Sequence, residues 1–108
     1  MNVKVDIIGM DTSKLPRLSS AEQVEMLKKL KSGKKEYKEK FIEANLRLVL
    51  SIVKKFNNRG ENVNDIFQVG VVGLIKAIDN FDITQPVQFS TYAVPMIIGE
   101  IKIRKKRI

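Results

Sequence analysis

The sequence predicts an all-α protein, in which a compact domain of about four helices follows an irregular N-terminal segment. Two observations favour this fold class. Apolar residues recur at helical spacing through most of the chain, and each periodic segment is bounded by capping residues, glycine or proline. The 108 residues are enough for one modest core. We therefore expect an irregular segment over residues 1–18, one domain over residues 19–101 and a basic tail over residues 102–108.

The first expected helix begins at Ser19, which stands three residues before Glu22, the spacing of a capping box. One face of this short helix carries Val24, Leu27 and Leu30. Gly33 should end the helix, because glycine readily adopts the left-handed conformation found at helix C-termini.

A longer helix is expected from about residue 35 to residue 57. Two neighbouring stripes run along it: Phe41, Asn45, Leu48, Ile52 and Lys55 form one, and Ile42, Leu46, Val49, Val53 and Phe56 form the other. Residues 46–53 are broadly apolar, so this helix should lie at the centre of the core. Gly60 is suited to the cap that follows its end.

The third expected helix covers residues 65–81, with Asn64 as its N-cap and Asp65 complementing the helix dipole. The face that should point into the core carries Phe67, Val71, Leu74, Ile78 and Phe81. Beside it, Gly70, Gly73 and Ala77 form a strip on which a second helix can approach closely. Glycine within a helix costs about 1 kcal/mol relative to alanine, so packing should explain the two glycines.

The opposite face of this third helix carries Gln68, Val69, Val72, Lys76 and Asp79. A solvated helix face normally carries charge, so the two valines there indicate a covered surface. Either the rest of the chain buries this face, or a partner protein docks on it. The small size of the domain favours a partner, because a chain this short buries only about 60–65% of its unfolded surface.

Residues 82–88 break the helical period and contain Pro86, which predicts a loop. A fourth helix should begin at Ser90. Pro95 should kink this helix or mark a late start, because proline lacks the N–H of the helical hydrogen bond.

From Phe81 to Met96 the sequence has aromatic and hydroxyl side chains but no lysine or arginine. Such a segment suits stacking on unpaired nucleotides better than gripping phosphates. The alternative interpretation is that Phe81 and Phe89 close the core while Tyr92 packs on them. Both interpretations are open at this point.

The composition excludes several classes of function. Histidine and cysteine are absent, which removes the commonest general base, the commonest zinc ligand and any disulfide. We expect no catalysis, no metal site and no cofactor. No apolar run reaches the ~18–20 residues of a membrane span, and the first residues lack the layout of a signal peptide, so a cytoplasmic protein without membrane contact is expected. The net charge of +8 supports nucleic-acid binding only weakly, because residues 102–108 contribute five of these charges.

Five motifs follow one another along the chain. They are Asn45-Leu46-Arg47-Leu48-Val49, Asn58-Arg59-Gly60, Asp65-Ile66-Phe67-Gln68-Val69-Gly70, Gly73-Leu74-Ile75-Lys76-Ala77-Ile78-Asp79-Asn80-Phe81-Asp82 and Phe89-Ser90-Thr91-Tyr92-Ala93. In this order they resemble bacterial RNA polymerase sigma factors of the sigma-70 family, over roughly residues 20–101. Residues 94–101 look like the sporulation and stress branch of that family. Residues 11–16 are similar to the N-terminus of its late forespore member.

The resemblance implies that the helix over residues 65–81 docks on the coiled-coil clamp in the largest subunit of core RNA polymerase. The positions that match polymerase-contacting residues are Leu46, Arg47, Val49, Asp65, Gln68, Val69, Val72, Ile75 and Lys76. Four of them lie on the helix face that the apolar pattern leaves unexplained. An anti-sigma factor is a second candidate partner.

The resemblance also implies recognition of the promoter −10 element through its unpaired non-template strand. The positions that match residues around the flipped adenine are Phe81, Asp82, Phe89, Thr91 and Tyr92, and the further expected DNA contacts are Ser90, Pro95, Met96, Lys102 and Arg104. Pro95 and Met96 stand where the housekeeping factor has paired tryptophans that wedge the upstream fork. This difference implies weaker unaided melting and a stricter promoter preference.

Family members continue into an arginine-rich aromatic helix and two more domains, whereas residues 102–108 keep the charge without that pattern. We therefore expect a sigma factor truncated after its second domain, which directs transcription initiation at the −10 element. The alternative is an interaction-only fragment that binds polymerase or an anti-sigma factor and does not initiate.

Overall fold

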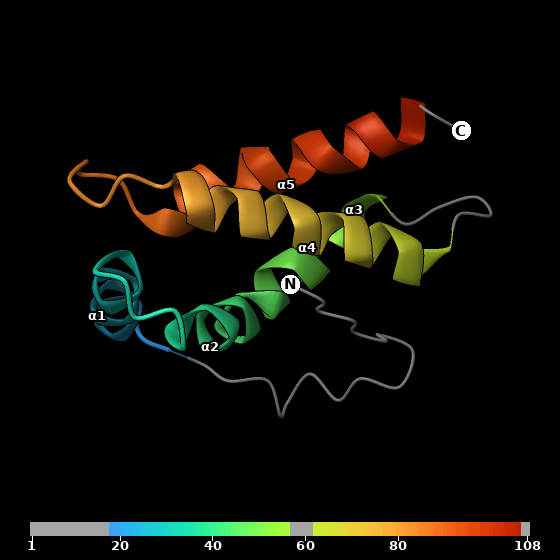
Figure 1. Ribbon diagram of the computed structural model, residues 1–108. Helices are drawn as coiled ribbons and strands as arrows, with labels where there is room; N and C mark the ends of the chain where they lie inside the picture. Colours follow the sequence, from blue (N-terminus) through green and yellow to red (C-terminus); the bar gives the residue numbers. More distant parts are fainter. Residues whose placement is uncertain (1–17, 57–61, 107–108) are drawn as a thin grey trace.

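The computed structural model describes residues 18–56 and 62–106, with side chains up to Ile103, and these residues form an all-α fold, as predicted. Its helices are α1 (Ser20–Lys31), α2 (Tyr37–Ala44), α3 (Leu46–Phe56), α4 (Val63–Asn80) and α5 (Phe89–Lys106). Figure 1 shows α4 and α5 side by side in opposite directions, with α1 and α2 toward the end where residues 81–88 connect the pair. The expected irregular segment lies, apart from Leu18, outside the described residues.

The first helix begins as predicted. The Ser19 hydroxyl accepts a hydrogen bond from the Glu22 N–H at 3.1 Å, and the Glu22 carboxylate accepts one from the Ser19 N–H at 3.0 Å. The chain leaves α1 through Gly33, whose φ of 105° is in the left-handed region. On the expected apolar face Leu27 is buried, but Val24 is 51% exposed, so the described residues cover that face only in part.

The expected single helix from about residue 35 to residue 57 is wrong, because a break at Asn45 divides it into α2 and α3. Asn45 is buried, and its side-chain amide donates to the Phe41 carbonyl at 2.9 Å. Its own carbonyl accepts from the N–H groups of Leu48 and Val49 in the first turn of α3. Asparagine competes for backbone hydrogen bonds in this way. The described fold therefore has five helices instead of about four.

The N-cap of α4 is Asn62 instead of the expected Asn64. The Asn62 side-chain oxygen accepts from the N–H groups of Asn64 at 2.9 Å and Asp65 at 3.3 Å. Asn64 therefore lies inside the first turn, where Asp65 complements the helix dipole as predicted. The cap expected at Gly60 lies outside the described residues.

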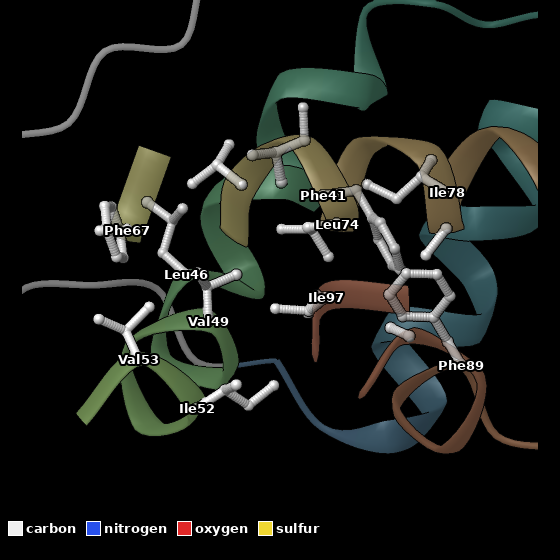
Figure 2. Packing of buried hydrophobic residues seen from close by; sticks show 14 of the residues in the cluster. Phe41, Leu46, Val49, Ile52, Val53, Phe67, Leu74, Ile78, Phe89 and Ile97 are labelled. Atoms are coloured by element: carbon white, nitrogen blue, oxygen red, sulfur yellow. The ribbon is translucent and has the colours of Figure 1, made fainter. Parts of the chain in front are cut away.

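The hydrophobic core forms where α4 meets the other helices (Figure 2). The predicted core face of α4 is confirmed, since Phe67, Val71, Leu74, Ile78 and Phe81 are all buried. The other helices contribute Leu27, Phe41, Ile42, Leu46, Val49, Ile52, Val53, Phe89, Ala93, Ile97 and Ile101. Leu48 belongs to an expected core stripe but is only half-buried, because the break at Asn45 turns α3 relative to α2.

The glycine strip of α4 is confirmed as a place of close helix packing. A Cβ atom on Gly70 would lie 2.7 Å from Cγ1 of Val49 on α3. A Cβ atom on Gly73 would lie 2.7 Å from Cα of Ile97 on α5. Neither distance is compatible with an ordinary van der Waals contact, so the two glycines allow α3 and α5 to approach α4.

The last helix begins at Phe89, one residue before the expected start at Ser90, and contains Pro95 in its interior. It continues to Lys106, so most of the expected basic tail over residues 102–108 is helical. The boundary after residue 101 is therefore a change in charge and not a change in backbone structure.

Candidate functional site

The predicted outward face of α4 carries Gln68, Val69, Val72, Lys76 and Asp79. Asp79, at its C-terminal end, is exposed and pairs with Lys38 of α2. We call the remaining four residues, together with the neighbouring Ile75, the outer face. Val72 is 44% exposed and Lys76 is exposed, whereas the other three side chains are half-buried. The described helices thus do not bury this face, and the interpretation in which the chain encloses α4 on both sides is wrong for the described residues. The Lys76 ammonium pairs with the Glu100 carboxylate of α5, which holds that end of the outer face.

Two residues that the resemblance assigns to polymerase contact lie inside the domain. Leu46 and Val49 of α3 are 3% and 0% exposed. They pack in the core between α3 and α4, so the folded domain offers a partner almost no side-chain surface at these two positions. Arg47 is half-buried and Asp65 is exposed, so both reach the surface.

A series of aromatic rings leads from the core to the surface. Phe89 packs edge-on against Phe41 and Phe81, with ring centroids 5.0 Å and 5.4 Å apart. Tyr92 follows at 5.5 Å from Phe81 and is only half-buried. Phe81 and Phe89 are buried and close the core, and the little surface that they keep faces the hollow described below. Tyr92 is the ring of this series that reaches the surface.

The remaining residues expected to contact DNA lie along α5. They are the exposed Thr91, Pro95 and Lys102 and the half-buried Ser90 and Met96. Arg104 lies on the same helix, but its side chain is outside the described residues. The first turns of α5 therefore present hydroxyl and apolar groups beside Tyr92.

Asp82 organises the loop that follows α4. Its carboxylate accepts hydrogen bonds from the Thr84 hydroxyl at 2.6 Å and from the Thr84 N–H at 2.9 Å. The hydroxyl bond, and then the backbone bond, lower the pKa of the exposed Asp82 carboxyl. The ionised Asp82 carboxylate therefore holds the start of the loop of residues 82–88 in place next to the aromatic rings.

A hollow of about 530 Å³ lies between α1, the junction of α2 with α3, and the loop of residues 82–88. Its lining combines apolar Leu27, Leu48, Phe81 and Phe89 with polar Ser20, Gln23, Asn45, Gln88 and Ser90. Val24, Ile83 and Val87, which also line it, are 51%, 41% and 45% exposed. Sequence reasoning missed this hollow, because its walls come from distant parts of the chain. The sequence feature that could have indicated the hollow is the presence of two apolar residues, Ile83 and Val87, in a polar loop.

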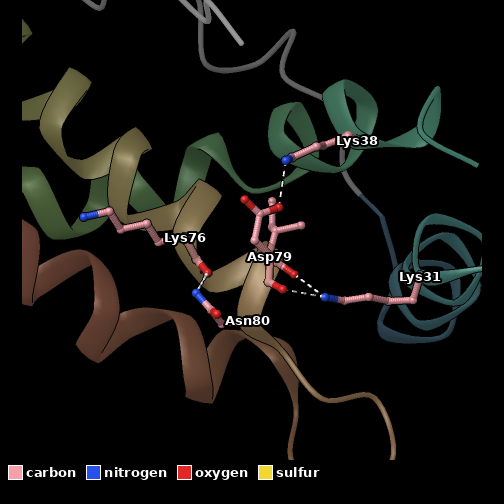
Figure 3. Close-up of polar contacts among 6 residues, drawn as sticks. Lys31, Lys38, Lys76, Asp79 and Asn80 are labelled. Carbon is pink, nitrogen blue, oxygen red and sulfur yellow. Dashed lines mark hydrogen bonds and ion pairs between the residues drawn. The ribbon is translucent and has the colours of Figure 1, made fainter. Parts of the chain in front are cut away.

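The C-terminal end of α4 is held by lysines from two other helices (Figure 3). The ammonium of Lys31 in α1 donates to the carbonyl groups of Ile78 at 2.6 Å and Asp79 at 3.1 Å. The ammonium of Lys38 in α2 pairs with the Asp79 carboxylate at 2.7 Å. We call Lys31, Lys38 and Asp79 the α4 clasp. The loop that contains Asp82 starts directly after it.

The site consists of surfaces rather than reacting groups: an apolar helix face, an exposed aromatic edge and a hollow. Among the described residues, no group of three or more acidic, histidine or cysteine side chains could hold a metal ion. In the same part of the chain, no helix has the length and apolarity to cross a membrane.

Comparison with known families identifies the family of the chain. The Sigma-70 region 2 family matches residues 41–107, which is more than half of the chain. The chain therefore belongs to the sigma-70 family, within which the match covers region 2.

The relatives include sigma-G factors. The chain is 62% identical over 99 residues to the RNA polymerase sigma-G factor of Clostridium acetobutylicum, covering 92% of this chain and 38% of that protein. It is 57% identical over 100 residues to the sigma-G factor of Bacillus subtilis, covering 92% and 38%. It is also 58% identical over 99 residues to a putative RNA polymerase sigma-G factor of Bacillus thuringiensis subsp. kurstaki, covering 92% and 79%. The chain thus spans about two-fifths of the length of the first two relatives.

Proposed function

We propose that this chain acts as a sporulation sigma factor that binds core RNA polymerase and recognises the −10 element on the unpaired non-template strand. Membership of the sigma-70 family and similarity to sigma-G factors support this proposal. The outer face of α4 docks on the coiled-coil clamp of the largest polymerase subunit. Tyr92 and the neighbouring residues of α5 bind the DNA.

The exposure of Val72 is the observation that carries the docking step. The opposite face of α4 is fully enclosed, and Leu74 and Ala77 there are 0% exposed. Val72, at 44%, leaves a large apolar side chain in water beside the half-buried Val69 and Ile75. A partner that covers these side chains gains the free energy of removing apolar surface from water. Lys76 adds a charged rim that Glu100 holds in place.

The docking step is tested by placing a charge on this face. Val72→Glu should abolish copurification with core RNA polymerase and should lower the free energy of unfolding by less than about 1 kcal/mol, as expected for an exposed site. Val24→Glu is the matched control, because Val24 is a similarly exposed valine on α1, at 51%. Polymerase binding by Val72→Glu, or equal losses in both variants, would contradict the proposal.

The proposed recognition of the −10 element is supported by the sequence from Phe81 to Met96, which contains no lysine or arginine. A surface with an aromatic edge, hydroxyl groups and the adjoining hollow can receive an unpaired base, whereas duplex binding normally relies on phosphate contacts. Tyr92 is held by Phe81 behind it, so its ring is oriented before DNA arrives. A promoter-opening assay on the assembled complex separates a chain that initiates from one that only binds.

A further inference from the structure

The C-terminal end of α4 lacks the usual means of stabilisation. Its last turn contains the acidic residue Asp79 and no basic residue. The residue that follows the helix, Phe81, is in an extended conformation, so a left-handed glycine cap is not used here. A negative charge at a helix C-terminus is unfavourable, because the helix dipole already places partial negative charge on the last carbonyl groups.

The two lysines of the α4 clasp supply the positive charge that the end of α4 lacks. Lys31 donates to the carbonyl groups of Ile78 and Asp79, which the helix itself leaves without partners. Lys38 neutralises the Asp79 carboxylate at 2.7 Å. Within α4, the Asn80 side chain donates to the Lys76 carbonyl at 2.8 Å. Lys31 thus binds two of the last carbonyl groups of α4, while Lys38 and Asn80 add polar contacts to the same turn (Figure 3).

The position of the clasp connects it to the proposed DNA site. The residue after Asn80 is Phe81, whose ring supports Tyr92 at 5.5 Å. Asp82 follows, and the hydrogen bonds from Thr84 lower the pKa of its carboxyl most, while the charge of Lys31 adds the smallest part. A change in the direction in which the chain leaves α4 would therefore move both the ring behind Tyr92 and the loop that walls the hollow.

We infer that Lys31 is a positioning residue for −10 recognition, because it fixes the end of α4 from which Phe81 and the loop of residues 82–88 leave. This inference rests on the proposed function. Lys31 lies at the last position of α1, a helix that also lines the hollow. One ammonium group therefore sets both the exit of α4 and the distance between α1 and the loop.

The test uses the full chain in complex with core RNA polymerase and a fork-junction DNA whose −10 non-template strand is unpaired. Lys31→Met keeps the aliphatic stem but removes the charge and the donors. It should weaken DNA binding about three- to tenfold, the range expected for losing charge-assisted hydrogen bonds at a half-buried group. Affinity for polymerase should stay unchanged, because the Lys31 ammonium contacts only the backbone at the C-terminal end of α4 and none of the outer-face side chains.

Two further variants separate positioning from charge. Lys29→Met removes the same charge from an exposed position of α1 that does not line the hollow, and should leave DNA binding unchanged. Lys31→Arg retains the charge and the donors and should restore most of the affinity. In the chain alone, amide hydrogen exchange at Asp79 and Asn80 should be faster in Lys31→Met than in Lys29→Met, since the last turn of α4 opens more often.

The outcomes distinguish the inference from the proposed function. If the unaltered complex does not bind the −10 strand, the proposed function is wrong and the inference falls with it. If the unaltered complex binds and Lys31→Met binds equally well, the inference alone is wrong. Equal losses of DNA binding in Lys31→Met and Lys29→Met would contradict the inference, because the effect would then follow from net charge and not from the position of Lys31. A loss of polymerase binding in Lys31→Met would make Lys31 a purely structural residue.

Discussion

Replacing the buried glycines of α4 by alanine tests the packing of the domain directly. In a helix interior, glycine to alanine gains about 1 kcal/mol from helix propensity. Forcing an extra methyl group into a packed interface costs about 1–3 kcal/mol. The sign of each substitution therefore depends on what the new Cβ atom meets.

At Gly73 the new atom would lie 2.7 Å from Cα of Ile97 and 3.0 Å from the Met96 carbonyl oxygen. Both neighbours are backbone atoms, so α5 as a whole must move, and the cost should be in the upper part of that range, about 2–3 kcal/mol. After the gain in helix propensity, we expect a net loss of about 1–2 kcal/mol. At Gly70 the tight contact is the Val49 side chain and the next neighbours are at 3.6 Å, so the loss should be smaller. At Gly99 nothing lies within 4 Å, so that variant should gain about 0.5–1 kcal/mol.

The assay is thermal and urea-induced unfolding of the three alanine variants beside the unaltered chain. For a domain of this size, 1 kcal/mol corresponds to about 4–8 °C in Tm, so Gly73→Ala and Gly99→Ala should differ by about 6–24 °C. Gly99→Ala serves as the internal control for the propensity gain. If Gly73→Ala were as stabilising as Gly99→Ala, then α4 and α5 would not be in the close contact described above.

Two further predictions concern Tyr92 and the cap of α1. Tyr92→Ala should weaken binding of the polymerase complex to the unpaired −10 strand about tenfold, the effect of losing one stacked base, while the other tyrosine, Tyr37→Ala, should not; equal binding by both variants would contradict stacking. The pKa of Glu22 is lowered, first by the backbone hydrogen bond from Ser19, so the stabilisation by this carboxylate is present above its ordinary pKa of 4.5 and is lost as the pH falls through the lowered value. Glu22→Gln should therefore flatten the acid side of the stability curve measured by urea unfolding, and an unaltered curve would show that the capping box does not form.

The faces of α4 could be predicted from sequence because one helix repeats a regular pattern over five turns. Phe67, Leu74 and Ile78 follow the helical period and are buried, and Val72 departs from it and is exposed. The α2–α3 break could not be predicted in the same way. The apolar stripes run through Asn45 without interruption, and only the hydrogen bond from its side chain to Phe41 reveals why the helix ends there.

The sequence predicts which segments form the candidate site, but it does not predict which side chains of these segments reach the surface. Leu46 and Val49 match contact positions in the family, yet they lie in the core of this domain. A sequence match assigns a role to a position, whereas burial depends on which helix packs against it. The α4 clasp shows the same limit, since Lys31 and Ile78 are separated by 47 positions and no local pattern pairs them.

The basic end of α5 requires a different experiment from the one that the sequence suggests. Deleting residues 102–108 would remove a helical turn that directly follows the buried Ile101, so lost charge and lost structure would be mixed. Lys102→Gln keeps the helix and removes one exposed charge. If Lys102 neutralises one phosphate, the slope of log affinity against log salt should fall by about 0.9, whereas Lys54→Gln, an exposed lysine of α3, should leave it unchanged. If the salt dependence of DNA affinity is the same for Lys102→Gln and Lys54→Gln, Lys102 contacts no phosphate. Other basic residues of the polymerase complex must then attract the DNA.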